Sequence, residues 1–181
     1  DEGAEVANRL RELGEQVEFT ARDGVVSAWW IVGPFPAPTV ESWGNAEWPE
    51  RGVDLAKGGA GGMAWRPVET GDADGIVELD ALFRPNNQVV AYAYAEIDSR
   101  KERDAVLKVG SDDGIRVWLN GELVHANHAL RGCTPGEDSV TVRLKEGPNA
   151  LLVKVCEMHG GWAFCAALFD EQGRPLKFRI R

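Results

Sequence analysis

Two adjacent carboxylates stand near the middle of the chain, in the sequence Ser111-Asp112-Asp113-Gly114. Like charges on consecutive residues repel one another, and a tight turn needs no such pair. Hard cations, calcium above all, take carboxylate and carbonyl oxygens from loops of this kind. We therefore expect Asp112 and Asp113 to bind calcium. The alternative is an ordinary turn, because Asp-Gly is a common turn signal.

A second group of acids and aromatic side chains lies in residues 37–62, which are rich in Gly and Pro and show little periodicity. Such an irregular segment suits contact with a metal or a sugar, and it equally suits a loop pinned to the core by its Trp residues. Flat aromatic faces stack on sugar rings, while acids and amides bind the hydroxyl groups. The ligand-binding residues predicted on this basis are Glu41, Trp43, Trp48, Asp112, Asp113 and Trp162.

Short strands are predicted to position these residues. Apolar and polar residues alternate along residues 105–109 and 115–119, on either side of the acidic pair. Asn120-Gly121 then favours a type I′ turn, with a return strand over residues 122–125. Further strands are expected at residues 63–67, 76–83, 88–97, 139–144, 150–156, 162–169 and 175–180. Many short strands punctuated by Gly and Pro predict an all-β fold, an antiparallel β-sandwich of jelly-roll type.

The first residues have a different pattern. Val6, Leu10 and Leu13 recur at helical spacing before Gly14, which predicts a short N-terminal helix. This helix is either docked on the sandwich or left over from an upstream domain. We expect residues 1–16 to form an N-terminal helix or linker remnant and residues 17–181 to form the β-sandwich domain. Because the chain begins with Asp1, we expect it to be a processed or excised piece of a larger, multidomain protein.

The balance of acidic and basic residues bears on which class of macromolecule the chain binds. The chain has 29 acidic and 20 basic residues, a formal net charge of −9, and the basic residues are scattered. A nucleic-acid partner is therefore disfavoured, because it requires a clustered basic surface. No apolar run approaches the length of a membrane span. Seven Trp and 21 Gly residues suit a β domain rich in loops.

Three segments carry a resemblance to a known family: residues 30–35 (Trp-Ile-Val-Gly-Pro-Phe), 110–124 and 142–155. Together they resemble the galactose-binding-like β-sandwich superfamily and are similar to non-catalytic carbohydrate-binding modules of secreted bacterial enzymes. The Asp-Asp-Gly turn followed by an Asn-Gly hairpin also resembles protective-antigen-type lectin domains of cell-surface adhesins. Those domains hold calcium with an Asp-Asp pair joined by a cis peptide bond, and the calcium contacts sugar hydroxyls.

The resemblance implies a polysaccharide or glycan partner and an extracellular or periplasmic location. It maps a metal site onto Asp112 and Asp113, and Asn127 is a third metal candidate by residue type alone. Calcium is the cofactor that the resemblance implies. The alternative is a structural or interaction domain of a larger surface protein that binds no sugar.

Signs of catalysis are missing from the sequence. An enzyme should show a nucleophile beside a base, a pair of placed carboxylates or a phosphate-binding loop. No serine has the glycine pattern of a nucleophile elbow, and the glycine run at residues 58–62 lacks the Lys-Ser/Thr of a phosphate loop. We expect a protein that is not an enzyme. The remaining catalytic alternative is a glycoside hydrolase that pairs Glu41 with Asp112 or Asp113.

Two of the three cysteines have a predicted pairing. If Gly160-Gly161 forms a two-residue turn, Cys156 lies directly opposite Cys165 on neighbouring strands. Residues paired in this way are close enough for a disulfide. We therefore predict that Cys156 and Cys165 are bonded or face each other.

Overall fold

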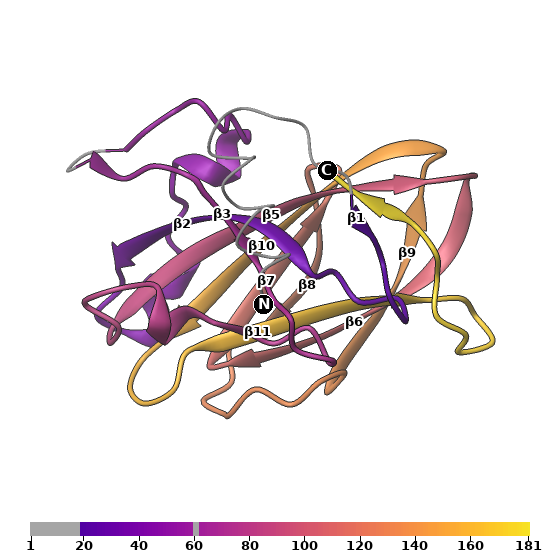
Figure 1. Ribbon diagram of the computed structural model, residues 1–181. Coiled ribbons are helices and arrows are strands. Elements are labelled where there is room, and N and C mark those ends of the chain that lie inside the picture. The colour runs from indigo at the N-terminus through magenta and orange to yellow at the C-terminus, as the bar shows by residue number, and fades with distance from the viewer. Residues whose placement is uncertain (1–18, 60–61) are drawn as a thin grey trace.

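The computed structural model describes residues 19–59 and 62–181, which form two antiparallel β-sheets (Figure 1). The eight-stranded sheet has the order β1 (Phe19–Thr20), β12 (Arg179–Ile180), β5 (Val89–Ser99), β10 (Gly147–Glu157), β7 (Gly114–Leu119) and β8 (Glu122–Asn127), with β2 (Ala28–Pro36) paired to β5 and β3 (Arg66–Glu69). The four-stranded sheet has the order β4 (Val77–Glu78), β11 (Ala163–Phe169), β6 (Arg103–Asp112) and β9 (Asp138–Leu144). The predicted all-β, sandwich-like architecture is confirmed.

The core between the sheets follows from the period of two along each strand. Leu107 and Val109 of β6 and Val153 and Val155 of β10 are fully buried in one apolar cluster. Neighbouring residues point to opposite faces of a strand, so adjacent aromatic residues must separate. Of the Trp29-Trp30 pair, accordingly, Trp29 is fully buried and its neighbour is half-buried.

The short helices in the described part of the chain are 3₁₀ helices: η1 (Val40–Gly44), η2 (Trp48–Arg51) and η4 (Leu79–Ala81). The predicted helix at residues 2–13 lies outside the described residues. A strand was expected over residues 76–83, but η4 follows β4 directly. The reason is that the amides of Leu79 and Asp80 both donate to the carbonyl of Trp162, which turns the chain out of the strand. No described helix is long and apolar enough to cross a membrane.

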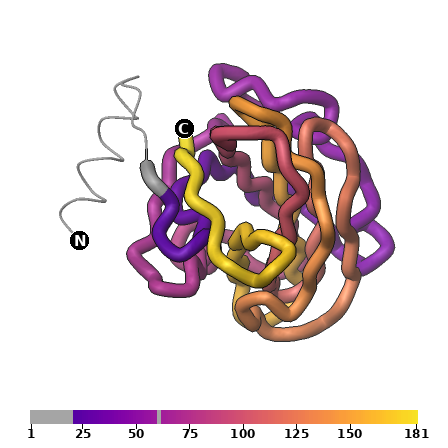
Figure 2. The backbone as a smooth tube through the Cα atoms, turned by 90° about the vertical axis from the view of Figure 1, so that its right-hand side faces the viewer, coloured from indigo at the N-terminus to yellow at the C-terminus, as the bar shows by residue number. Residues whose placement is uncertain are grey.

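The segment that carries η1 and η2 covers the outer face of the eight-stranded sheet, and Figure 2 shows it in purple along the outside of the sandwich. A second apolar cluster lies beneath it, around the fully buried Trp43. The Lys154 side chain, also fully buried, donates from Nζ to the carbonyl of Asn45 (2.6 Å) and to Oε1 of Glu50 (3.0 Å). The Tyr92 hydroxyl donates to the same Glu50 carboxylate. These contacts fix the irregular segment to the sheet.

The central hairpin has the predicted geometry. β7 pairs with β8, and Asn120 and Gly121 at its turn both have positive φ, 53° and 83°. These are the conformations that a type I′ turn requires.

The predicted pairing of Cys156 with Cys165 is wrong. β10 and β11 do not form a hairpin, because β10 lies in the eight-stranded sheet and β11 in the four-stranded sheet. Cys156 is paired with Gly114 and Val90, whereas Cys165 is paired with Gly110. The chain crosses between the sheets after β10, so the register across Gly160-Gly161 never forms.

Candidate cation-binding site

The acidic pair lies where the chain changes sheets. β6 ends at Asp112 and β7 begins at Gly114, so the chain passes from the small sheet to the large one at Asp113. The peptide bond between Asp112 and Asp113 is cis. β10 ends at Glu157 and returns the chain to the small sheet at β11, whose Ala163 is paired with Asp112. Both crossings therefore occupy the same end of the sandwich.

Three carboxylates meet at this end. Asp112, Asp113 and Glu157 each bring an oxygen within 4.8 Å of the others. Asp112 is half-buried, Asp113 is buried and Glu157 is fully buried. Glu157 was missed in the sequence because it looks like the ordinary last residue of a strand. The sequence pattern that could have revealed Glu157 is the alternation of inward- and outward-facing residues along β10. This alternation places the Glu157 carboxylate on the same inward face of the strand as Val155.

Asp113 is held in place from several directions. Its Oδ1 accepts from the backbone N–H of Arg131 and its Oδ2 from that of Met158, each at 2.9 Å. Its own N–H donates to the carbonyl of Cys156 (2.8 Å), and the hydroxyl of Ser111 donates to its carbonyl oxygen (2.7 Å). A carboxylate anchored by backbone donors in this way is preorganised before any ligand arrives.

Glu157 has the opposite character. Both of its carboxylate oxygens are buried, and no donor among the described residues bonds to either of them. Burial, with the charges of Asp113 and Asp112, raises the pKa of Glu157 to about 8. Burial and the charge of Asp113 likewise raise the pKa of Asp112 to about 6. Buried carboxylates in contact require protons or a cation between them, because ionised carboxylates only accept.

The side chains at the cluster fit a hard cation. Three carboxylates supply oxygen donors of the kind that calcium takes. Space beside Asp112 is kept open by Gly161, where an added Cβ would lie 2.7 Å from Oδ2 of Asp112. Since Asp112 is half-buried, the cluster also has a route to solvent.

The side chain of Asn127, the third predicted metal ligand, binds Asp138 and does not join the three-carboxylate cluster. Its amide nitrogen donates to both carboxylate oxygens of Asp138, at 3.1 and 3.3 Å. Arg131 binds the same carboxylate through two nitrogens, at 2.6 and 3.2 Å, and donates to the Ser111 hydroxyl at 3.0 Å. The side chain of Asn127 therefore belongs to the contacts that hold residues 128–137 beside the cluster, and we do not retain it as a ligand.

Two of the predicted sugar-stacking residues have no free face. Trp43 and Trp162 are both fully buried. The Trp43 ring packs on Gly114, where an added Cβ would lie 2.8 Å from it. Trp162 packs against Phe83, with ring centroids 5.5 Å apart. Burial of a large aromatic ring removes much apolar area from water, and this gain explains why both rings lie in the core.

The other two predicted contacts in the irregular segment lie at its surface. Trp48 is half-buried and meets Trp65 edge-on, with ring centroids 5.8 Å apart. Glu41 is exposed in the first turn of η1, where a backbone hydrogen bond and the Thr39 side chain lower its pKa. Glu41 is not a member of the three-carboxylate cluster.

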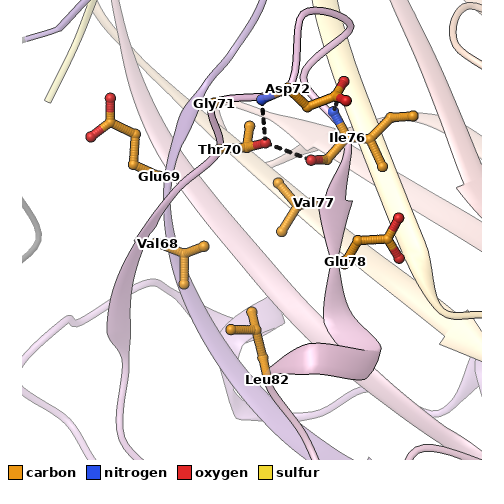
Figure 3. Close-up of a pocket in the computed structure, with 9 residues that line it drawn as sticks. All are labelled: Val68, Glu69, Thr70, Gly71, Asp72, Ile76, Val77, Glu78 and Leu82. Carbon is orange, nitrogen blue, oxygen red and sulfur yellow. Dashed lines mark hydrogen bonds between the residues drawn. The ribbon is translucent and has the colours of Figure 1, made fainter. Parts of the chain in front are cut away.

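A hollow of about 380 Å³ lies near the acidic cluster, between β3 and β4 (Figure 3). Figure 3 shows the apolar side chains of Val68, Val77 and Leu82 lining it. Glu78 stands at its edge and is paired with Ala163, which is paired in turn with Asp112. The hollow therefore begins two strands from the acidic pair, roughly 10 Å away at the usual strand spacing.

A second hollow, of about 260 Å³, lies on the outer face of the large sheet. Its lining includes the half-buried aromatic residues Tyr94 and Trp118, with Glu50 and Leu152. Partly exposed aromatic faces at this position are able to stack on a flat ligand.

No family model and no curated protein sequence matches the chain. Solved structures do: a β-glucosidase from Kluyveromyces marxianus in complex with glucose has 12% identity over 78% of this chain and 16% of that chain, with a TM-score of 0.49. An anti-sigma factor domain-containing protein has 18% identity over 86% of this chain and 44% of that chain, with a TM-score of 0.47. A PA14 sugar-binding domain from an RTX adhesin has 17% identity over 66% of this chain and 58% of that chain, with a TM-score of 0.41. This chain spans less than two thirds of each of these proteins, and the similarities are too low to carry an argument about activity.

Proposed function

We propose that this chain is a non-catalytic carbohydrate-binding module that holds calcium at Asp112, Asp113 and Glu157. The observation that supports the proposal is the Glu157 carboxylate, which is fully buried beside two other acids and receives no hydrogen bond from residues 19–59 or 62–181. A cation at this position neutralises the cluster and satisfies the Glu157 oxygens together. The resemblance of the Asp-Asp-Gly turn to calcium-dependent lectin domains agrees with the same ion.

The sugar would meet the cation from the side of Asp112. Calcium takes about six to eight oxygen ligands, and three carboxylates leave positions for neutral oxygens. Adjacent hydroxyl groups of a sugar supply such oxygens in pairs. The half-buried Asp112 faces the accessible side, and the hollow edged by Glu78 offers room for the rest of a glycan nearby. We infer a secreted or surface location, as part of a larger protein.

Calcium binding is tested by calorimetry on the full chain, with magnesium as the matched control ion. Calcium should bind and raise the unfolding temperature, whereas Asp113→Asn and Glu157→Gln should each abolish that rise. Asp74→Asn, at an exposed acid outside the cluster, should leave the rise intact. Equal effects of calcium on the wild type and on both site variants would contradict the proposed site.

The Tyr94–Trp118 hollow supports a second candidate, which is sugar binding by aromatic stacking without a cation. A glycan array run with calcium and with a chelator separates the two. Binding that is lost with chelator and with Asp113→Asn supports the calcium model. Binding that survives chelator and falls with Trp118→Ala supports stacking. The absence of binding to any glycan would favour an interaction or spacer domain.

We also propose that the acidic cluster is not a hydrolytic site. Its ligand atoms lie within 4.8 Å of one another. A glycosidase needs two carboxyl groups that reach the scissile bond of a bound sugar, whereas Asp113 and Glu157 are buried and Asp112 alone of the three is partly exposed. Release of the chromophore from aryl glycosides that is abolished by Asp112→Asn would contradict this proposal.

A further inference from the structure

Two cysteines that the sequence did not pair come together on the outer face of the small sheet. Cys165 lies on β11, paired with Gly110 of β6. Residues 128–137, which connect β8 and β9, cross this face and carry Cys133. A Cβ added at Gly110 would collide with the carbonyl oxygen of Thr134 and lie 3.1 Å from Sγ of Cys165. Gly110 therefore lets the segment lie directly on the sheet, with Cys133 beside Cys165.

Both thiols are free. The backbone of Thr134, the residue after Cys133, lies over Gly110, and the Cys165 sulfur lies on the same face of the sheet beside Gly110. In agreement with this proximity, Cys165 raises the pKa of Cys133, and Cys133 lowers the pKa of Cys165. Cys133 is half-buried and Cys165 is buried, so Cys133 is the thiol that a reagent reaches first.

We propose that Cys133 and Cys165 are the disulfide-forming pair of this protein, oxidised by a small-molecule disulfide such as oxidised glutathione. The Cys133 thiol, the more exposed of the two, loses its proton as its sulfur attacks one sulfur of the oxidant, which forms a mixed disulfide and releases one glutathione thiolate. The Cys165 thiolate then attacks the Cys133 sulfur, forms the internal disulfide and releases the second glutathione thiolate. Two cysteine thiols are oxidised, one disulfide is reduced, and the two cysteine protons pass to the released thiolates.

The bond would fasten residues 128–137 to β11. Arg131, two residues before Cys133, gives its backbone N–H to Asp113 and its guanidinium to Asp138. The disulfide would thus hold the segment that positions Asp113. It depends on the placement of Cys133 and Cys165 beside Gly110, so it stands or falls independently of any cation at the acidic cluster.

Oxidised glutathione in a native buffer, followed by peptide mapping without reductant, tests the assignment on the whole chain. The expected product has lost two hydrogens, links the peptides of Cys133 and Cys165, and leaves Cys156 free. Its unfolding temperature should rise by roughly 5–10 °C over the reduced form, as closing a loop of this length predicts. Cys133→Ser should prevent the link, and Cys156→Ala should preserve it.

Three outcomes of the oxidation experiment would contradict the assignment. Three free thiols after oxidation, a stable glutathione adduct on Cys133 with no internal link, or a link through Cys156 would each overturn the assignment. If Cys133→Ser lowers the yield of folded protein, Cys165→Ala serves in its place. Circular dichroism of each variant before oxidation establishes that the fold is intact.

Discussion

The carboxylates of Glu157 and Asp113 face each other at the end of the sandwich, and the two residues differ in how they are satisfied. Asp113 receives a backbone donor on each oxygen, while neither oxygen of Glu157 receives one from any described residue. Backbone hydrogen bonds therefore hold the Asp113 carboxylate in place, whereas the buried Glu157 carboxylate has lost its hydration without gaining a donor from the described residues. Because this desolvation cost falls on Glu157, a substitution of Glu157 is the most informative test.

Glu157→Gln is expected to have opposite effects with and without calcium. In chelator and above the Glu157 pKa of about 8, the amide removes one of three clustered charges and supplies a donor toward Asp113, so the free energy of unfolding should rise by about 1 kcal/mol. With calcium, loss of a charged ligand should weaken binding at least about tenfold. Urea unfolding and calorimetry measure the two effects. Glu146→Gln, at an exposed acid, is the control, and a similar result for both variants would argue against the cluster.

Gly161→Ala should weaken calcium binding while leaving the fold nearly intact. The added methyl group would lie 2.7 Å from Oδ2 of Asp112, a side-chain end that is able to move away. Gly132→Ala is the matched control, because nothing lies within 4 Å of a Cβ added there. Calcium titration of both variants, alongside their unfolding temperatures, distinguishes the two positions. Unchanged calcium affinity in Gly161→Ala would show that Asp112 does not contribute a ligand.

Asp138→Asn should lower stability in a way that depends on pH. The hydrogen bond from Arg131, with weaker ones from His125 and Asn127, lowers the pKa of Asp138 from 3.8 to about 2. The stabilisation, about 2 kcal/mol, is therefore complete above the unfolded-state pKa and is lost as pH falls from 3.8 toward 2. Urea unfolding of wild type and variant should differ near neutral pH and converge in acid. A difference that does not change with pH would argue against this ion pair.

Lys154→Met should destabilise the covering segment strongly. The Lys154 side chain is fully buried and that of Glu50 is 11% exposed, so removing the ammonium leaves a buried carboxylate without its counter-ion. The expected loss is about 3 kcal/mol, and the double variant Lys154→Met/Glu50→Gln should recover a large part of it. Chemical unfolding of the single and double variants, with the exposed Lys101→Met as control, measures the coupling. Additive losses would show that the pair is not coupled.

Local patterns predicted much of the fold. The alternation at residues 105–109 and 115–119 and the Asn120-Gly121 turn correspond to β6, β7 and the hairpin as found. These features depend on the period of a strand and on φ preferences, which neighbouring residues determine. Asp112 and Asp113 were selected by the same local reasoning, and they lie together with a third carboxylate.

Long-range contacts account for what was not predicted. Glu157 and Asp113 are distant in the sequence, and only the crossing of both chain segments between the sheets brings them together. The same crossing separates Cys156 from Cys165, although a hairpin would have paired them. Trp43 and Trp162 are typical stacking residues in isolation, yet burial of a large ring in the core was the stronger effect. Strand partners and burial follow from packing across the sandwich, which spacing along the chain does not encode.

Placement of the acidic cluster at both passages between the sheets has a mechanical consequence. Pulling the two sheets apart would separate Asp112, at the end of β6, from Glu157, at the end of β10. An ion bound by both residues would cross-link the two sheets, and the force needed to separate the sheets would increase with calcium concentration. In a protein anchored at a cell surface, the same carboxylates would then determine both the affinity of the domain for its ligand and the tension at which the domain unfolds.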